Sequence, residues 1–228
     1  MHEAKSILLQ PYSSARMKLR NTLFVLVFLY ASCFSAFGQT AKSVLDETSV
    51  LLQSCGDIEA SFHASQFNGT QEVGSTQGTI FISGNKFKIQ TTELTSWFDG
   101  STLWNLLAGS DEVNISTPTS VELQRLNPYF FVNLYKSGYN LSLSEVDYAG
   151  KSCHSVTLKA QSNSAEVQTL LLTIDKTSKL PLSIRLKDKK GDWFRVRVSN
   201  VHTGKSFKAS TFQFNEKDYP GIEVIDLR

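Results

Sequence analysis

Apolar and polar residues alternate with a period of two along most of this 228-residue chain. The clearest run is at its C-terminal end, where Phe194, Val196 and Val198 alternate with Arg195 and Arg197. A strand with one buried face and one solvent-facing face gives this pattern, which is typical of antiparallel sheets. The alternation recurs often enough to predict about ten or eleven strands. The chain is therefore predicted to be mainly β, as one antiparallel meander.

One predicted turn, Asp99-Gly100, lies between two tryptophans in the stretch WFDGSTLW. An acidic residue in such surroundings is either a catalytic carboxylate or a turn residue. Asp-Gly between two alternating runs is a strong hairpin signal, because both residues tolerate positive φ. We interpret Asp99 as a turn residue and its aromatic neighbours as sheet residues.

Two segments depart from the period of two. Residues 41–55 place apolar side chains three and four positions apart, which predicts a helix that ends at the following glycine. A capping box, Thr119-x-x-Glu122, and a helix start at Asn127-Pro128 predict one or two helices inserted into the meander. A long open sheet curls and needs a cover over its concave apolar face. The predicted architecture is an unclosed half β-barrel, lidded by the N-terminal helix and the inserted helices.

The interior of such a half barrel either packs solid or encloses a lipid-sized cavity. Composition alone favours the solid core, because filled interiors are the default for small barrel-like folds.

Residues 1–38 are predicted to be an upstream extension followed by a signal peptide that starts at Met17. The segment MKLR is positive, residues 22–34 are apolar, and Ala36 and Gly38 have the spacing that a signal peptidase reads. The apolar run is shorter than the roughly 20 residues of a membrane-spanning helix. Residues 39–228 would then form the mature domain.

Cys33 offers an alternative, because YASC is similar to the motif at which lipoproteins are lipidated. Tyr30 stands where that motif prefers leucine, so cleavage near Gly38 is favoured over lipidation of Cys33. The two later cysteines, Cys55 and Cys153, either form a disulfide or are small buried hydrophobic residues, and the second alternative is favoured.

After position 38 the chain holds 19 basic and 20 acidic residues (23 − 4 and 21 − 1). This balance gives no support to binding of nucleic acid. His63, His154 and His202 lack metal-site spacing and are interpreted as surface or half-buried strand residues. The chain contains no GxSxG, GxGxxG or P-loop motif. We therefore predict a binding protein and not an enzyme, with no catalytic residue, metal or cofactor.

Six segments together resemble the LolA-like family of periplasmic outer-membrane lipoprotein carriers. They are GTIFISGNKF, WFDGSTLW, EVNISTPT, NPY, LTIDKTSKLP and the closing YPGIEVIDLR, and they extend over nearly all of residues 39–228. The resemblance implies an unclosed barrel with an apolar cavity for acyl chains, in place of a solid core. One departure concerns the lid: Ser83 and Gly84 stand where the family often has a basic residue and a proline.

The resemblance also implies the function and the partners. The protein would accept lipoproteins from an inner-membrane lipoprotein-releasing transporter, shield their acyl chains, and hand them to an outer-membrane acceptor or membrane, as a periplasmic monomer. An alternative of another class is a lipid-sensing regulatory or accessory protein of the envelope with the same fold.

Apolar residues at inward strand positions and on the helix faces are the expected cavity and lid. These residues are Leu45, Leu52, Phe62, Phe87, Ile89, Phe98, Trp104, Phe130, Phe131, Leu134, Ile184 and Val196.

Overall fold

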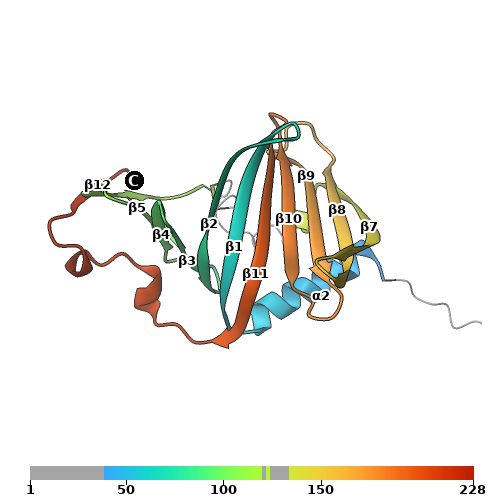
Figure 1. The fold of residues 1–228 in the computed structure, drawn as a ribbon, viewed down its shortest axis with the longest axis horizontal. Helices are drawn as coiled ribbons and strands as arrows, with labels where there is room; N and C mark the ends of the chain where they lie inside the picture. Colours follow the sequence, from blue (N-terminus) through green and yellow to red (C-terminus); the bar gives the residue numbers. More distant parts are fainter. Residues whose placement is uncertain (1–38, 120–121, 124–133) are drawn as a thin grey trace, which may run out of the picture. The chain divides into compact units, whose positions relative to one another are not determined.

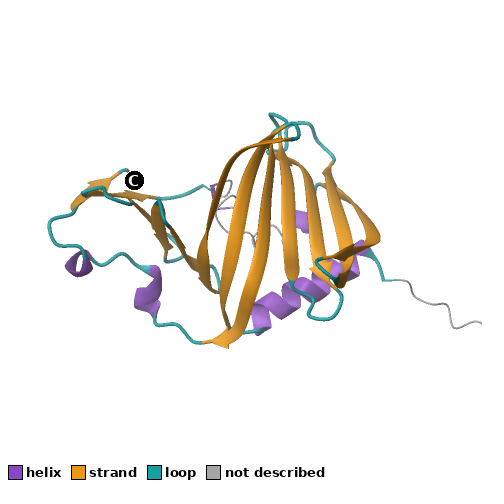
Figure 2. Ribbon diagram, viewed as in Figure 1, coloured by secondary structure: helices purple, strands orange, loops and turns teal. Residues whose placement is uncertain are grey.

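The computed structural model describes residues 39–119, 122–123 and 134–228. Within them, one long helix, α2 (Ala41–Ser54), precedes a single curved sheet (Figures 1 and 2). Residues 39–228 form one compact unit. The predicted signal peptide, Phe130 and Phe131 lie outside the described residues.

The described part of the chain forms twelve strands. They are β1 (Asp57–Asn68), β2 (Gln71–Ser83), β3 (Lys86–Thr91), β4 (Leu94–Phe98), β5 (Leu103–Leu107), β6 (Glu112–Ser116), β7 (Tyr139–Tyr148), β8 (Lys151–Ala160), β9 (Val167–Asp175), β10 (Pro181–Asp188), β11 (Trp193–Lys205) and β12 (Glu223–Asp226). Two short 3-10 helices, η2 (Ala209–Phe212) and η3 (Glu216–Asp218), lie between β11 and β12.

The strand order across the sheet is β12-β6-β5-β4-β3-β2-β1-β11-β10-β9-β8-β7. Its two edges, β12 and β7, are not paired with each other, so the prediction of an unclosed sheet is confirmed. All neighbours are antiparallel except β12 and β6, which run parallel. The parallel pair was not predicted, because it arises from a long C-terminal crossover and not from a local hairpin.

The predicted N-terminal helix is confirmed as α2. Thr40 and Ser43 form a capping box: Thr40 Oγ1 accepts a hydrogen bond from the Ser43 N–H (3.1 Å), and Ser43 Oγ accepts one from the Thr40 N–H (2.9 Å). The helix ends at Cys55, and Gly56 follows with a φ of +75°, a conformation that favours glycine. We call the sheet face that packs against α2 the inner face, and the opposite one the outer face.

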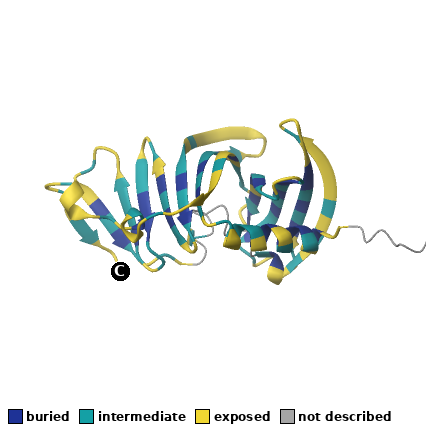
Figure 3. Ribbon diagram, turned by 90° about the horizontal axis from the view of Figure 1, so that it is seen from below, coloured by how far each residue is buried: buried dark blue, intermediate teal, exposed yellow. Residues whose placement is uncertain are grey.

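Two hydrophobic clusters lie on the inner face. Figure 3 shows where buried residues occur along the strands. The first cluster comprises Ala41, Val44, Leu45, Tyr135, Val156, Leu158, Val167, Leu170, Leu172, Ile174, Ile184 and Leu186. The second cluster comprises Ile58, Ala60, Ile80, Ile82, Phe87, Ile89, Phe98, Leu103 and Val198. The start of α2 belongs to the first cluster, and Leu52 near its end packs against the second.

The C-terminal segment covers part of the outer face with aromatic side chains. Trp97 on β4 contacts Phe214 and Tyr219, with ring centroids 5.6 and 6.0 Å apart. Phe81 on β2 contacts Phe207 at 5.6 Å. These edge-to-face contacts attach the segment that leads to β12, and they account for one of the two tryptophans in WFDGSTLW.

The other tryptophan, Trp104, was wrongly placed in the predicted cavity. Trp104 pairs with Trp97, whereas Phe98 pairs with Leu103, so Trp104 and Phe98 project from opposite faces. A hairpin loop with an even number of residues after Phe98 always places Leu103 on the same face as Phe98, and Trp104 on the other face. Trp104 therefore belongs to the outer face.

Asp99 is confirmed as a turn residue. Its Oδ1 accepts hydrogen bonds from the N–H groups of Ser101 (3.0 Å) and Thr102 (2.9 Å), and Gly100 has a φ of +106°. Partial burial acts to raise the pKa of Asp99, but these hydrogen bonds outweigh it and lower the pKa. The carboxylate is thus kept ionised by the turn that it stabilises.

His154 departs from the prediction of a surface or half-buried strand residue. It is 4% exposed and alternates in phase with Val156 and Leu158, so it projects from the inner face. Burial, and then the nearby Lys176 and Lys179, lower its pKa. His63 is half-buried and His202 is exposed, as predicted.

Candidate functional site

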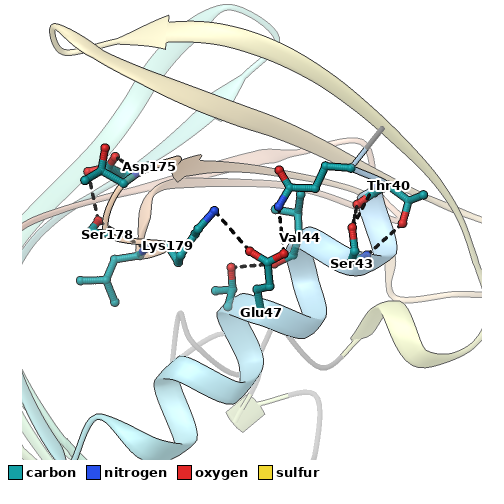
Figure 4. Close-up of polar contacts among 11 residues, drawn as sticks. Thr40, Ser43, Val44, Glu47, Asp175, Ser178 and Lys179 are labelled. Carbon is teal, nitrogen blue, oxygen red and sulfur yellow. Dashed lines mark hydrogen bonds and ion pairs between the residues drawn. The ribbon is translucent and has the colours of Figure 1, made fainter. Parts of the chain in front are cut away.

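The turn between β9 and β10 contacts α2 (Figure 4). Lys179, at the end of this turn, forms an ion pair with Glu47 of α2, with Nζ and Oε2 3.2 Å apart. Lys179 has a φ of +59°, and its N–H donates to the carbonyl of Asp175 (2.9 Å). The left-handed conformation directs the chain back into β10 and places the ammonium group beside the helix.

Asp175 organises the same turn from a buried position. Its carboxylate accepts hydrogen bonds from the Thr177 N–H (2.9 Å) and the Ser178 hydroxyl (3.0 Å), and it pairs with Lys151 at 2.9 Å. Burial acts to raise the pKa of Asp175, but the Lys151 hydrogen bond and the turn hydrogen bonds lower it to about 2.

The chain that follows the inserted segment is attached to α2 as well. Tyr135 is 7% exposed, lies in the first cluster, and donates a hydrogen bond from its hydroxyl to Asp46 Oδ1 (2.6 Å). Burial, together with the Asp46 carboxylate, raises the pKa of Tyr135 to about 12. The predicted capping box is also confirmed, since the Thr119 N–H donates to Glu122 Oε2 (2.7 Å) and the Glu122 N–H donates to Thr119 Oγ1 (3.3 Å).

An apolar hollow of about 450 Å³ lies on the inner face, at the strand ends away from α2. In Figure 1 the turns β1–β2 and β10–β11 are at the upper end of these strands, and α2 crosses their lower end. The lining residues are Ala64, Ser65, Gln66, Gly74, Ser75, Thr76, Leu186, Phe194, Arg195 and Val196. By strand register, Ala64 pairs with Val196, and Leu186 pairs with Phe194, so these four side chains share the inner face.

Two side chains at the hollow are more exposed than the cluster residues, whereas Leu186 belongs to both the hollow and the first cluster. Phe194 and Val196 are half-buried, although they alternate in phase with the buried Val198. The hollow has the size of known ligand pockets, about 300–1,000 Å³. Its lining offers apolar surface with a few neutral amide and hydroxyl groups at the rim, and this chemistry suits binding of a hydrocarbon chain.

Charged side chains do not converge on this hollow. Arg195 is the one charged residue of the lining, and by alternation its side chain projects from the outer face. Among the described residues, no group of three or more His, Cys, Asp or Glu could hold a metal ion.

Comparison with known families identifies the chain. The model of the family described as "Outer membrane lipoprotein carrier protein LolA" matches residues 31–190, well over half of the sequence. The chain belongs to this LolA family. Membership supports a carrier-type role that involves lipoprotein binding. None of the curated proteins matches the sequence.

Several solved structures resemble this LolA-family chain in fold. A DUF1329 family protein from Desulfovibrio piger is 12% identical, with a TM-score of 0.46, over 77% of this chain and 98% of that one. A LolA superfamily protein from Nitrosomonas europaea is 12% identical, with a TM-score of 0.41, over the same shares. The MucA/MucB complex of Pseudomonas aeruginosa matches at 17% identity and a TM-score of 0.42, over 78% of this chain and 62% of that one. At these scores the likenesses carry no argument about function.

The predicted cavity residues of this LolA-family chain divide into groups. Val196 lines the hollow. Leu45 and Ile184 are buried in the first cluster, and Leu134 packs against it. A larger group belongs to the second cluster or packs against it: Leu52, Phe62, Phe87, Ile89 and Phe98. Most predicted residues therefore belong to the inner-face clusters or pack against them, and they do not line the hollow.

Three residues of the hollow were missed: Ala64, Leu186 and Phe194. Each stands at an inward position of an alternating run, so the sequence contained the signal for its face. The sequence contained no signal for which inward positions α2 leaves uncovered, because that depends on where along the strands the helix crosses the sheet.

Cys55 and Cys153 are free thiols in the structure, as the favoured alternative predicts. Cys55 ends α2 and packs against the second cluster on the inner face. Cys153 alternates out of phase with the inward Val156, so it projects from the outer face of β8. The sheet thus separates the two side chains.

No helix in the described ranges is long and apolar enough to cross a membrane.

Proposed function

We propose that this LolA-family protein binds acyl chains of lipoproteins, or of related lipids, in the apolar hollow and carries them through the periplasm. The observation that carries the proposal is the half-exposed inner face at Ala64, Phe194 and Val196, which α2 leaves uncovered. Exposed apolar surface of this kind, on the concave side of a sheet, marks a ligand-binding groove.

Burial of the acyl chain supplies the binding free energy without any covalent bond to the protein. Each methylene group moved from water to apolar surroundings contributes about 0.8 kcal/mol. An acyl chain therefore gains several kcal/mol from partial burial, and release requires an acceptor that offers comparable apolar surface. The proposed donor is an inner-membrane lipoprotein-releasing transporter, and the proposed acceptor is the outer membrane or a protein in it.

The proposal includes a soluble periplasmic form that begins near Gln39, after removal of a signal peptide. A carrier has to cross an aqueous gap, whereas a protein with two or more acyl chains stays with its membrane. Sequencing the mature N-terminus after envelope fractionation tests this part. A lipid-modified Cys33 in the membrane fraction would contradict it and would favour the regulatory alternative.

The binding site is tested by Val196→Glu, with Val146→Glu as the matched control. Val196 lines the hollow, whereas Val146 is 40% exposed on the edge strand β7 and projects from the outer face. A carboxylate at position 196 should abolish loading of a fluorescent fatty acid, because burying an ionised group among acyl chains is strongly unfavourable. The control should load normally.

Equal loading by both variants would show that the hollow is not the acyl site. Native mass spectrometry of the wild-type protein from its host envelope supplies the cargo class. Co-purified diacyl or triacyl species would support the carrier, and a consistently empty protein would argue against it.

A further inference from the structure

The hairpin formed by β10 and β11 concentrates positive charge. Between positions 185 and 197 it contains six of the 19 basic residues that follow position 38, against two acidic residues. The basic residues are Arg185, Lys187, Lys189, Lys190, Arg195 and Arg197. Because the domain as a whole is nearly neutral, this hairpin gives it a strongly asymmetric charge distribution.

The register places four of these cations on the outer face: Arg185, Lys187, Arg195 and Arg197. Arg185 is directly opposite Arg195 in the β10–β11 pair. Like charges at directly opposed positions destabilise a sheet. The residues paired with these two arginines on the neighbouring strands are not acidic. Arg185 pairs with Leu171 on β9, and Arg195 pairs with Ser65 on β1.

Aromatic rings support the cations without neutralising them. The guanidinium of Arg185 lies 5.1 Å from the ring centroid of Trp193, and the ammonium of Lys187 lies 5.9 Å from the same ring. The guanidinium of Arg195 lies 4.8 Å from the ring centroid of Phe67. Cation–π contacts of this kind hold a cation at the surface and leave its charge available to a ligand.

Few carboxylates compensate this charge. Arg195 approaches Glu72 at 3.5 Å, and Lys189 pairs with Glu166. The Asp188 carboxylate accepts hydrogen bonds from the N–H groups of Lys190 and Asp192 inside the turn. No carboxylate of the described residues forms an ion pair with Arg185, Lys187 or Arg197. The Nε of Arg195 is buried and has no hydrogen-bond partner among those residues.

The inner side of the same hairpin lines the hollow. Leu186, Phe194 and Val196 alternate with the basic residues and project to the opposite face. One hairpin therefore presents cations and a tryptophan on one side and the proposed acyl site on the other.

We propose that the outer face of the β10–β11 hairpin docks this protein on an anionic lipid bilayer, with the hollow on the opposite side of the same hairpin. The proposal rests on the proposed function, because acyl cargo leaves and enters membranes. Arg185 and Arg197 are exposed on this face, and clustered Lys and Arg are attracted to anionic headgroups. Trp193 adds an amphipathic ring of the type that lies at the headgroup level.

The test is co-sedimentation of the purified protein with vesicles. Neutral phosphatidylcholine vesicles are compared with vesicles that contain about 30 mol % phosphatidylglycerol, at low salt and at about 0.5 M salt. The wild-type protein should bind the anionic vesicles, and salt should release it. The triple variant Arg185→Gln, Arg195→Gln, Arg197→Gln should bind at least about tenfold more weakly.

The control triple variant Lys205→Gln, Lys208→Gln, Lys217→Gln removes the same charge from the far end of β11 and from the C-terminal segment, and it should retain binding. Equal binding of the wild-type protein to neutral and anionic vesicles would overturn the proposal, and this result does not depend on how any variant folds. Binding to polyglutamate but not to anionic vesicles would also overturn it and would indicate an acidic protein partner.

Fatty-acid loading without vesicles separates this proposal from the proposed function. Wild-type protein that loads fatty acid but ignores anionic vesicles refutes the docking alone. Wild-type protein that binds anionic vesicles but never loads fatty acid refutes the carrier role and leaves the docking standing.

Discussion

Two regions of the inner face share one sequence pattern but differ in packing. On β8 and β9, the inward residues Val156, Leu158, Leu170 and Leu172 are 0% exposed and pack in the first cluster with α2. On β11, the inward residues Phe194 and Val196 are half-buried and border the hollow. The β8 and β11 runs both alternate apolar and polar residues, whereas β9 has three consecutive leucines at 170–172. The pattern therefore decides which face a side chain occupies, and the covering helix decides whether that face is solid or open.

The placement of α2 explains the difference. Its 14 residues are about 21 Å long, since an α-helix rises about 1.5 Å per residue. The helix crosses the lower ends of the strands in Figure 1, whereas the hollow lies at the upper ends of β1, β2, β10 and β11.

The largest expected effect compares the two regions directly. Leu172→Ala should lower the free energy of unfolding by about 3 kcal/mol, because it leaves a cavity in a region that cannot collapse. Val196→Ala should cost less than about 1 kcal/mol, because its site is already open. Urea denaturation of both variants measures the difference. Similar losses would show that the two regions are packed alike.

The next effect concerns the β9–β10 turn, which contacts α2 through Lys179. Asp175→Asn should cost on the order of 2 kcal/mol at neutral pH, because the pKa of Asp175 is about 2 instead of 3.8. A lowered pKa stabilises the folded state above the ordinary value, and this contribution disappears as the pH falls through about 2. The gap between wild-type and variant unfolding free energies should therefore narrow between about pH 4 and pH 2. A gap independent of pH would refute the assigned role.

A smaller effect is expected where Tyr135 meets α2. Tyr135→Phe removes the hydrogen bond to Asp46 and should cost about 1 kcal/mol. Tyr148→Phe, at the end of the edge strand β7, serves as the control and should be nearly neutral. Thermal unfolding of the two variants measures the difference in stability. If Tyr135→Phe is as stable as the wild-type protein, the Tyr135–Asp46 hydrogen bond does not stabilise the packing of α2.

The smallest effect is a difference in thiol reactivity. Thiol counting on denatured, unreduced mature protein should give two free thiols, because Cys55 and Cys153 are unpaired. In the native protein, Cys55 is half-buried and should react faster than Cys153, which is 0% exposed. Burial raises the pKa of both thiols, so both should react slowly. A count of zero would establish a disulfide.

Local sequence signals determined much of the fold. The period of two predicted the strands, the three- and four-residue spacing predicted α2, and the Asp99 turn and the Thr119 capping box were read correctly. The face of the misplaced Trp104 could also have been predicted from the sequence, because a hairpin loop with an even number of residues places Trp104 and Phe98 on opposite faces of the sheet. Each of these signals acts through residues close together in the chain.

Contacts between distant segments decided the rest. His154 is buried although its run reads as an ordinary strand, because α2 and the β9–β10 turn lie near it. The outer face at Trp97 is covered because a segment more than a hundred residues later returns to it. The hollow is open because α2 crosses the strands at their opposite ends. The sequence alone determined which face of each strand is apolar, because side-chain alternation is local; the tertiary structure decided which apolar positions are covered, because covering depends on the length and placement of other elements.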